Sequence, residues 1–170
     1  NVREVLLDVQ DRKEKILFFD CEPHFEVKFI RLAVADDPNL QLVLLQRTTE
    51  TKFFRVMVDS GDELAAGFPK TRDELFSYRG LILGSIEASA FTGDQLRMIS
   101  DFADRRGGGL MMIGGRRAFA EGGYAGTPVA DALPVVLESK QPESNMRLQV
   151  APTRAGQSHP VTQIEKTEEG

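Results

Sequence analysis

The segment Cys21-Glu22-Pro23-His24 places a thiol, a carboxylate and an imidazole within four positions. A cysteine beside a histidine can form a reactive thiolate, so Cys21 and His24 are candidates for nucleophilic catalysis, with His159 as a third from a distant segment. Free cysteines more often act as small, buried apolar side chains, and we expect that role for Cys21. A metal site made from these three residues would lack any recurring ligand spacing, so we expect no metal.

A second candidate site is the turn Gly114-Gly115-Arg116-Arg117, which follows a short apolar run. Backbone N–H groups beside two guanidinium groups suit a carboxylate or a phosphate. Together with Glu22 and Tyr124, this turn makes up the predicted ligand-binding residues. The plainer interpretation, which we favour, is that the glycines serve only the turn and that the arginines pair with Glu121 or Asp131.

The loop at residues 122–128 is rich in glycine and carries one aromatic side chain, Tyr124. Such a loop beside a pocket could act as a lid or contact a partner. We favour a structural loop in which Thr127 caps the helix that follows it, with Pro128 in the first turn.

The sequence contains no motif for a bound cofactor. The turn at residues 114–117 is neither a Walker loop, which continues as Gly-Lys-Ser/Thr, nor a Gly-x-Gly-x-x-Gly dinucleotide motif. The loop at residues 21–26 contains two acids and a proline, and the acids would repel the phosphate of a flavin. We therefore expect no cofactor.

Short apolar runs predict the strands that position these residues. The predicted strands are residues 16–19, 40–45, 81–84 and 110–113, with a short strand at 53–58 and a late one at 148–150. Two capping boxes, Thr71 with Glu74 and Thr92 with Gln95, open helices between them, and another short helix is expected at 127–133. We expect two helical stripes to face the core: Phe25, Phe29, Leu32 and Ala33, and Leu96, Ile99 and Ala103 with Phe102 beside them.

Strands that alternate with helices at these spacings indicate a parallel sheet with helices on both faces. We predict a doubly wound, flavodoxin-like α/β fold with a mostly parallel sheet. Ligands bind such folds beyond the carboxyl ends of the strands, where the strand order reverses. Residues 21–24, 84–87 and 114–117 are expected to meet there.

Composition limits the function classes that this chain can serve. It has 170 residues, 41% of them hydrophobic, and a net charge of −5, which argues against broad binding to nucleic acid. No apolar run approaches the roughly 18 residues of a membrane span, so we expect no direct membrane insertion. The start at Asn1 and the polar end suggest one domain of a longer protein. We expect a linker or edge strand at 1–14, the domain at 15–165 and a polar tail at 166–170.

Several motifs together resemble a known family. They are residues 19–26 (Phe-Asp-Cys-Glu-Pro-His-Phe-Glu), Gly67-Phe68-Pro69, residues 78–84, residues 107–115, and the Gly-Thr-Pro stretch at 124–128 followed by Leu133-Pro134-Val135. Over residues 15–165 this order resembles the class I glutamine amidotransferase-like domains. It is most similar to the set found in large bacterial membrane-associated proteins that carry von Willebrand factor type A regions. The resemblance implies a flavodoxin-like fold and a domain of a membrane-anchored bacterial protein.

The same comparison implies that the family's catalytic machinery is incomplete here. Active members carry a nucleophile elbow, Gly-x-Cys-x-Gly, where this sequence has Gly114-Gly115-Arg116. Their His-Pro-Glu signature is matched by His159-Pro160-Val161, without the Glu. We therefore expect a non-catalytic binding or interaction domain, whose partners are other domains of the parent chain or another protein. Two alternatives are a cysteine-dependent amidotransferase or hydrolase using Cys21, and a sensor of small anionic ligands at the strand ends.

Overall fold

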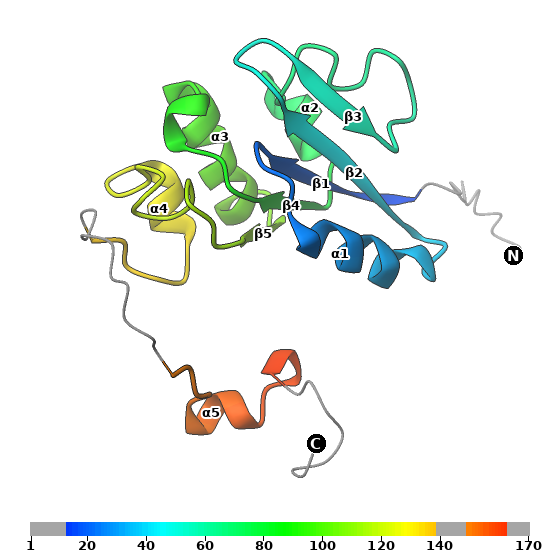
Figure 1. The fold of residues 1–170 in the computed structure, drawn as a ribbon. Helices are drawn as coiled ribbons and strands as arrows, with labels where there is room; N and C mark the ends of the chain where they lie inside the picture. The colour runs from blue at the N-terminus through cyan, green and yellow to red at the C-terminus, as the bar shows by residue number, and fades with distance from the viewer. Residues whose placement is uncertain (1–12, 139–148, 163–170) are drawn as a thin grey trace, which may run out of the picture.

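The computed structural model describes residues 13–138 and 149–162. Its centre is a five-stranded sheet in the order β3-β2-β1-β4-β5 (Figure 1). The strands are β1 (Glu14–Asp20), β2 (Leu40–Arg47), β3 (Phe53–Val56), β4 (Gly80–Leu83) and β5 (Gly109–Met112). All neighbouring pairs are parallel except β2 and β3, which are antiparallel. The predicted mostly parallel α/β sheet with flavodoxin-like topology is confirmed.

Helices lie between the strands, as the sequence pattern predicts, and further short helices follow β5. They are α1 (Phe25–Ala35), α2 (Arg72–Phe76), the 3-10 helix η1 (Ala88–Ala90), α3 (Gly93–Asp104), α4 (Pro128–Ala132), α5 (Arg154–Gln157) and the 3-10 helix η2 (Pro160–Thr162). Both predicted capping boxes form, at the starts of α2 and α3. Thr127 is the N-cap residue of α4 and Pro128 lies in its first turn, as predicted, but the Thr127 hydroxyl donates to the Tyr124 carbonyl and makes no capping hydrogen bond to the helix.

The two faces of the sheet carry cores of unequal size. Helices α2, α3 and α4 lie on one face, and α1 lies on the other (Figure 1). Alternation along β1 sends Leu17 and Phe19 into the larger core and Phe18 into the smaller one. In α3 the prediction is right for Ile99 and Phe102, which are buried, although Met98 completes the buried set and Leu96 is only partly buried.

The predicted core stripe of α1 is wrong. Phe25, Phe29 and Leu32 are 83%, 63% and 57% exposed, and Ala33 is exposed as well. The side chains that pack on the sheet are Val27, Ile30 and Val34, against Phe18, Leu42 and Ile82. Both stripes have helical spacing, so periodicity cannot choose between them. The smaller, branched side chains lie against the large Phe18 ring, and the helix therefore turns its bulkier apolar side chains to solvent.

The long connection between β3 and α2 is tied to the sheet by a partly buried charge network. Lys15 on β1 lies 2.8 Å and 3.0 Å from the two carboxylate oxygens of Glu63, and the Tyr78 hydroxyl donates to the same carboxylate at 2.8 Å. Burial alone would raise the pKa of Glu63, but the hydrogen bonds from Lys15, the Asp59 backbone and Tyr78 outweigh burial and hold that pKa below its ordinary value. The network fixes this connection against β1.

Some predictions about the chain ends fall on residues without a described structure. Within the late strand predicted at 148–150, Leu148 lies outside the described residues, while Gln149 and Val150 form no strand. The tail at 166–170 and most of the predicted linker or edge strand at 1–14 also lie outside them, and β1 already begins at Glu14. In residues 13–138 and 149–162 no helix is long and apolar enough to cross a bilayer.

Candidate functional site at the carboxyl ends of the strands

The sheet topology brings the three predicted segments together. The chain goes from β1 to β2 on one side and later returns to β4 on the other, so the strand order reverses between β1 and β4. Residues 21–24 follow β1 and residues 84–87 follow β4. The turn after β5 joins them, because the backbone N–H of Arg117 donates to the Ser85 hydroxyl at 3.2 Å.

Asp20 is the centre of this site, and sequence reasoning missed it. Its side chain is only 1% exposed. Oδ1 accepts hydrogen bonds from the backbone N–H groups of Cys21 at 2.7 Å, Glu22 at 3.1 Å and Ser85 at 3.0 Å. A Cβ on Gly84 would lie 2.6 Å from the Asp20 carboxyl carbon, so only glycine permits this approach. One carboxylate thus clamps the ends of β1 and β4 together.

His24 pairs with this carboxylate and not with the cysteine. Its Nδ1 is hydrogen-bonded to Oδ2 of Asp20, and its side chain is largely buried at the start of α1. Its Nε2 faces the turn after β5, where a Cβ on Gly115 would lie 3.4 Å from Nε2 and 2.8 Å from the Ser85 Oγ. The Cys–His pair, which the sequence offered only as a candidate for catalysis, therefore does not form in this structure. The glycine serves close packing of the turn on Ser85 and His24.

Cys21 is held as a hydrogen-bonded thiol. Its Sγ donates to the Ser85 carbonyl oxygen, and the Arg117 Nη1 lies 3.7 Å from the sulfur. Burial raises the pKa of this thiol; the Arg117 charge lowers it, but the surrounding carboxylates raise it, and the net shift is upward. The thiol is therefore protonated at neutral pH, which is the opposite of what an activated nucleophile needs.

Arg117 closes the site with ion pairs. Its Nε lies 3.7 Å from Oε1 of Glu22, and its Nη1 lies 3.6 Å from Oε2 of Glu87. Glu87 is also paired with Arg47, from the end of β2, and although burial alone would raise its pKa, these arginines hold it below the ordinary value. The predicted pairing with Glu121 or Asp131 is thus wrong for Arg117. Its partners, Glu22 and Glu87, follow the neighbouring strands β1 and β4. They are close to Arg117 in space although they are far from it in the sequence.

Arg116 differs from its neighbour. Both arginines are exposed, as are Gly114 and Gly115, but Arg116 forms no ion pair with any described residue. The two arginines of the turn therefore differ in their partners: Arg117 is held by Glu22 and Glu87, whereas the guanidinium of Arg116 faces solvent.

Tyr124 is part of the core. It is fully buried, and its hydroxyl donates to the Ile86 carbonyl at 2.8 Å. Burial and the nearby Glu87 charge raise its pKa. This position supports the structural interpretation of the loop at 122–128, since a fully buried ring cannot serve as a lid or touch a partner.

His159 is not brought to the site. It is exposed, and the hydrogen bonds described for it stay within residues 156–162, including one from the Val161 N–H to its Nδ1 at 3.2 Å. Across the described ranges, no group of three or more His, Cys, Asp or Glu side chains is placed to hold a metal ion.

Comparison with protein-family models, with curated proteins and with solved structures found no match to this chain. The fold class is therefore shown by the sheet itself, and any function must be argued from the side chains at the strand ends.

Proposed function

We propose that this domain is a non-catalytic, class I glutamine amidotransferase-like binding or interaction module of a larger bacterial protein. The observation that carries the proposal is the state of Cys21. Its thiol donates to the Ser85 carbonyl, and the Arg117 guanidinium lies beside the sulfur while it pairs with two carboxylates. Cys21, the candidate nucleophile, is thus engaged in an internal network of hydrogen bonds and ion pairs.

The turn after β5 also supports an inactive site. In active relatives of the resembled family this elbow carries the cysteine, and here the matching position is Arg116, which cannot act as the nucleophile. The position before it is closed to side chains, because a Cβ on Gly115 would meet Ser85 Cβ and Oγ at 2.8 Å. The flavodoxin-like sheet order agrees with the resemblance at the level of fold.

The test is reaction of the chain with a glutamine-like diazo-ketone, followed by intact mass measurement and peptide mapping, beside an assay for glutamine hydrolysis. We expect no labelling at Cys21 and no hydrolysis. A short cysteine peptide in the same tube shows that the reagent is active, and Cys21→Ser is the matched control. Selective labelling of Cys21 that the serine variant loses would establish the cysteine-dependent alternative instead.

A second candidate function is binding of a small anion at the turn. It is favoured by one observation: Arg116 is exposed beside two exposed glycines and forms no ion pair within residues 13–138 and 149–162. A ligand that binds only the folded state stabilises it and so raises the unfolding midpoint. At a ligand concentration one hundred times the dissociation constant, the free energy of unfolding increases by about 2.7 kcal/mol. A thermal-shift series with phosphate and small carboxylates tests this. We expect a shift that Arg116→Ala abolishes and that Arg97→Ala, which removes an exposed arginine on α3, keeps. Equal shifts in both variants would exclude the site.

A further inference from the structure

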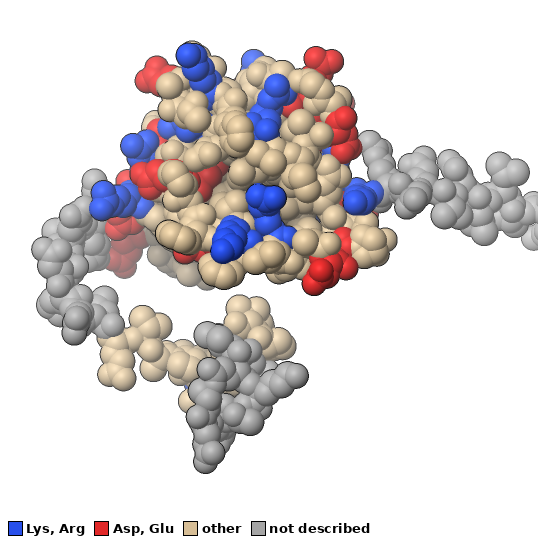
Figure 2. Space-filling model, turned by 45° about the vertical axis from the view of Figure 1, so that its right-hand side comes forward, with Lys and Arg blue, Asp and Glu red and all other residues tan. Residues whose placement is uncertain are grey.

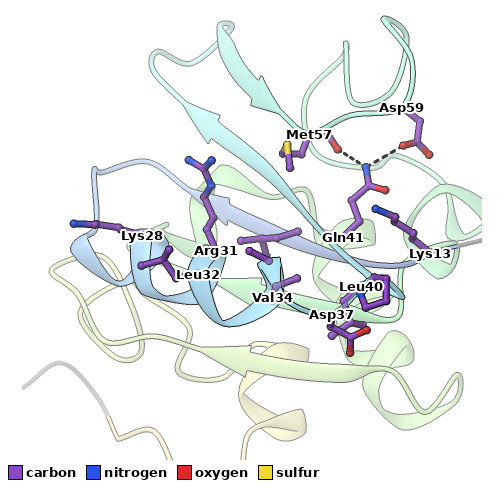
Figure 3. A pocket seen from close by; sticks show the side chains of 13 residues that line it. Lys13, Lys28, Arg31, Leu32, Val34, Asp37, Leu40, Gln41, Met57 and Asp59 are labelled. Atoms are coloured by element: carbon purple, nitrogen blue, oxygen red, sulfur yellow. Dashed lines mark hydrogen bonds between the residues drawn. The ribbon is translucent and has the colours of Figure 1, made fainter.

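The outer side of α1 carries the largest exposed apolar stripe of the described residues. Phe25, Phe29 and Leu32 are each more than half exposed. Leu32 also lines a groove of about 860 Å³ between α1, the start of β2 and the segment after β3 (Figure 3). Met57, 55% exposed, lies across the groove from the helix. Exposed apolar side chains gathered on one helix beside a groove are a feature of protein-binding surfaces.

The groove also presents unbalanced positive charge. Lys28 and Arg31 project from α1 and Lys13 lies at the other side (Figure 3), and none of these three cations forms an ion pair with a described residue. Figure 2 shows Lys and Arg side chains gathered on the lower part of the face that carries α1. This surplus stands out in a chain whose net charge is −5.

The acidic groups of the groove are already engaged. Asp59 lies 2.6 Å from the Lys15 Nζ and accepts a hydrogen bond from the Gln41 side chain at 2.9 Å. Asp37 accepts from the Asn39 backbone N–H at 2.9 Å, in the turn that leads into β2. The backbone hydrogen bond leaves the charge of Asp37 in place, but the groove still has three cations (Lys13, Lys28 and Arg31) against two carboxylates (Asp37 and Asp59). The net charge that meets an incoming ligand is therefore positive, and the complementary ligand is anionic.

We propose that α1 and this groove bind an acidic peptide segment of a partner protein, with apolar side chains that cover Phe29 and Leu32 and carboxylates that pair with Lys28 and Arg31. A peptide fits better than an extended polyanion. Nucleic acid binding needs many phosphate contacts, whereas the described residues supply this groove with only three cations, Lys13, Lys28 and Arg31. This proposal rests on the proposed binding function. It adds the surface that binds and the class of partner that is bound.

The experiment selects a displayed library of random dodecapeptides on the full chain and measures the affinity of the enriched peptides by fluorescence anisotropy. We expect enriched sequences to combine Asp or Glu with Leu, Ile or Phe. The double variant Lys28→Glu/Arg31→Glu should weaken their binding by about tenfold or more, because reversed charges face the carboxylates. Phe29→Ala should weaken it as well. Lys52→Glu, an exposed lysine in the turn between β2 and β3, should leave the affinity unchanged.

Several outcomes would overturn the docking surface. They are enrichment of neutral or basic peptides, no enrichment, or affinities that charge reversal leaves unchanged. Binding of a single-stranded oligonucleotide or of phosphatidylglycerol vesicles that the double variant alone loses would assign the surface to another ligand class. Self-association that the same variant abolishes would assign it to a second copy of this chain. Because labelling of Cys21 is measured separately, a failure of the docking surface is distinguishable from a failure of the proposed function.

Discussion

Removal of the Asp20 carboxylate should be the most damaging single substitution at the strand ends. Asp20→Ala leaves three backbone N–H groups without their acceptor, and one of them, from Ser85, is buried. A buried donor left unsatisfied costs about 1–3 kcal/mol, and a hydrogen bond to a charged group is worth about 1.5–3 kcal/mol. The Cys21 and Glu22 N–H groups are only partly buried and can reach water, so the expected total loss is about 3–5 kcal/mol.

Urea unfolding, followed by circular dichroism, measures this loss. Asp36→Ala, at the exposed end of α1, is the matched control and should change stability by less than about 0.5 kcal/mol. Asp20→Asn keeps one acceptor oxygen, so its loss of stability should lie between the losses of Asp20→Ala and Asp36→Ala. An Asp20→Ala protein within about 1 kcal/mol of the parent would refute the clamp, because a loss that small is typical of an ordinary substitution.

Three further predictions follow from the packing and the charges. In the same urea assay, Ile30→Ala should cost about 2 kcal/mol while Phe29→Ala stays within about 0.5 kcal/mol; the reverse order would restore the helix face predicted from sequence. Because the pKa of Glu63 is lower in the folded state, its contribution to stability is present above its unfolded pKa of about 4.3 and is lost as pH falls through the folded value. Acid unfolding should therefore depend less on pH in Glu63→Gln, and identical pH profiles would contradict this. Since the pKa of Cys21 is raised, alkylation by iodoacetamide should accelerate only above pH about 8.5, and Arg117→Ala should move that rise to still higher pH.

The sheet was predictable because its strands are short apolar runs and because two of the helices between them begin with a capping box. Both signals are local in the sequence. Thr71 with Glu74 and Thr92 with Gln95 open helices in the structure as they do in the sequence pattern. The face of α1 was not predictable, since two apolar stripes compete along the same helix. The choice between them depends on Phe18, which belongs to another element.

The location of the candidate site was predictable from the sequence, but its hydrogen bonds and ion pairs were not. The rule for parallel sheets brought residues 21–24, 84–87 and 114–117 to one edge. It could not show that His24 turns to Asp20, or that Arg117 reaches Glu22 and Glu87 across the strand ends. One signal was available, since an Asp at the end of a buried strand has to find hydrogen-bond donors.

The unequal cores have a consequence for motion. No residue of α1 is fully buried, whereas α3 buries Met98, Ile99 and Phe102. Amide hydrogens of α1 should therefore exchange with solvent through local opening, at a lower free energy than those of β1 and α3, which need global unfolding. Hydrogen exchange followed by mass spectrometry would resolve the two classes, and equal protection of α1 and α3 would contradict this. A ligand seated on α1 would slow exchange there first, so this helix is the part of the fold whose local stability a partner can most readily change.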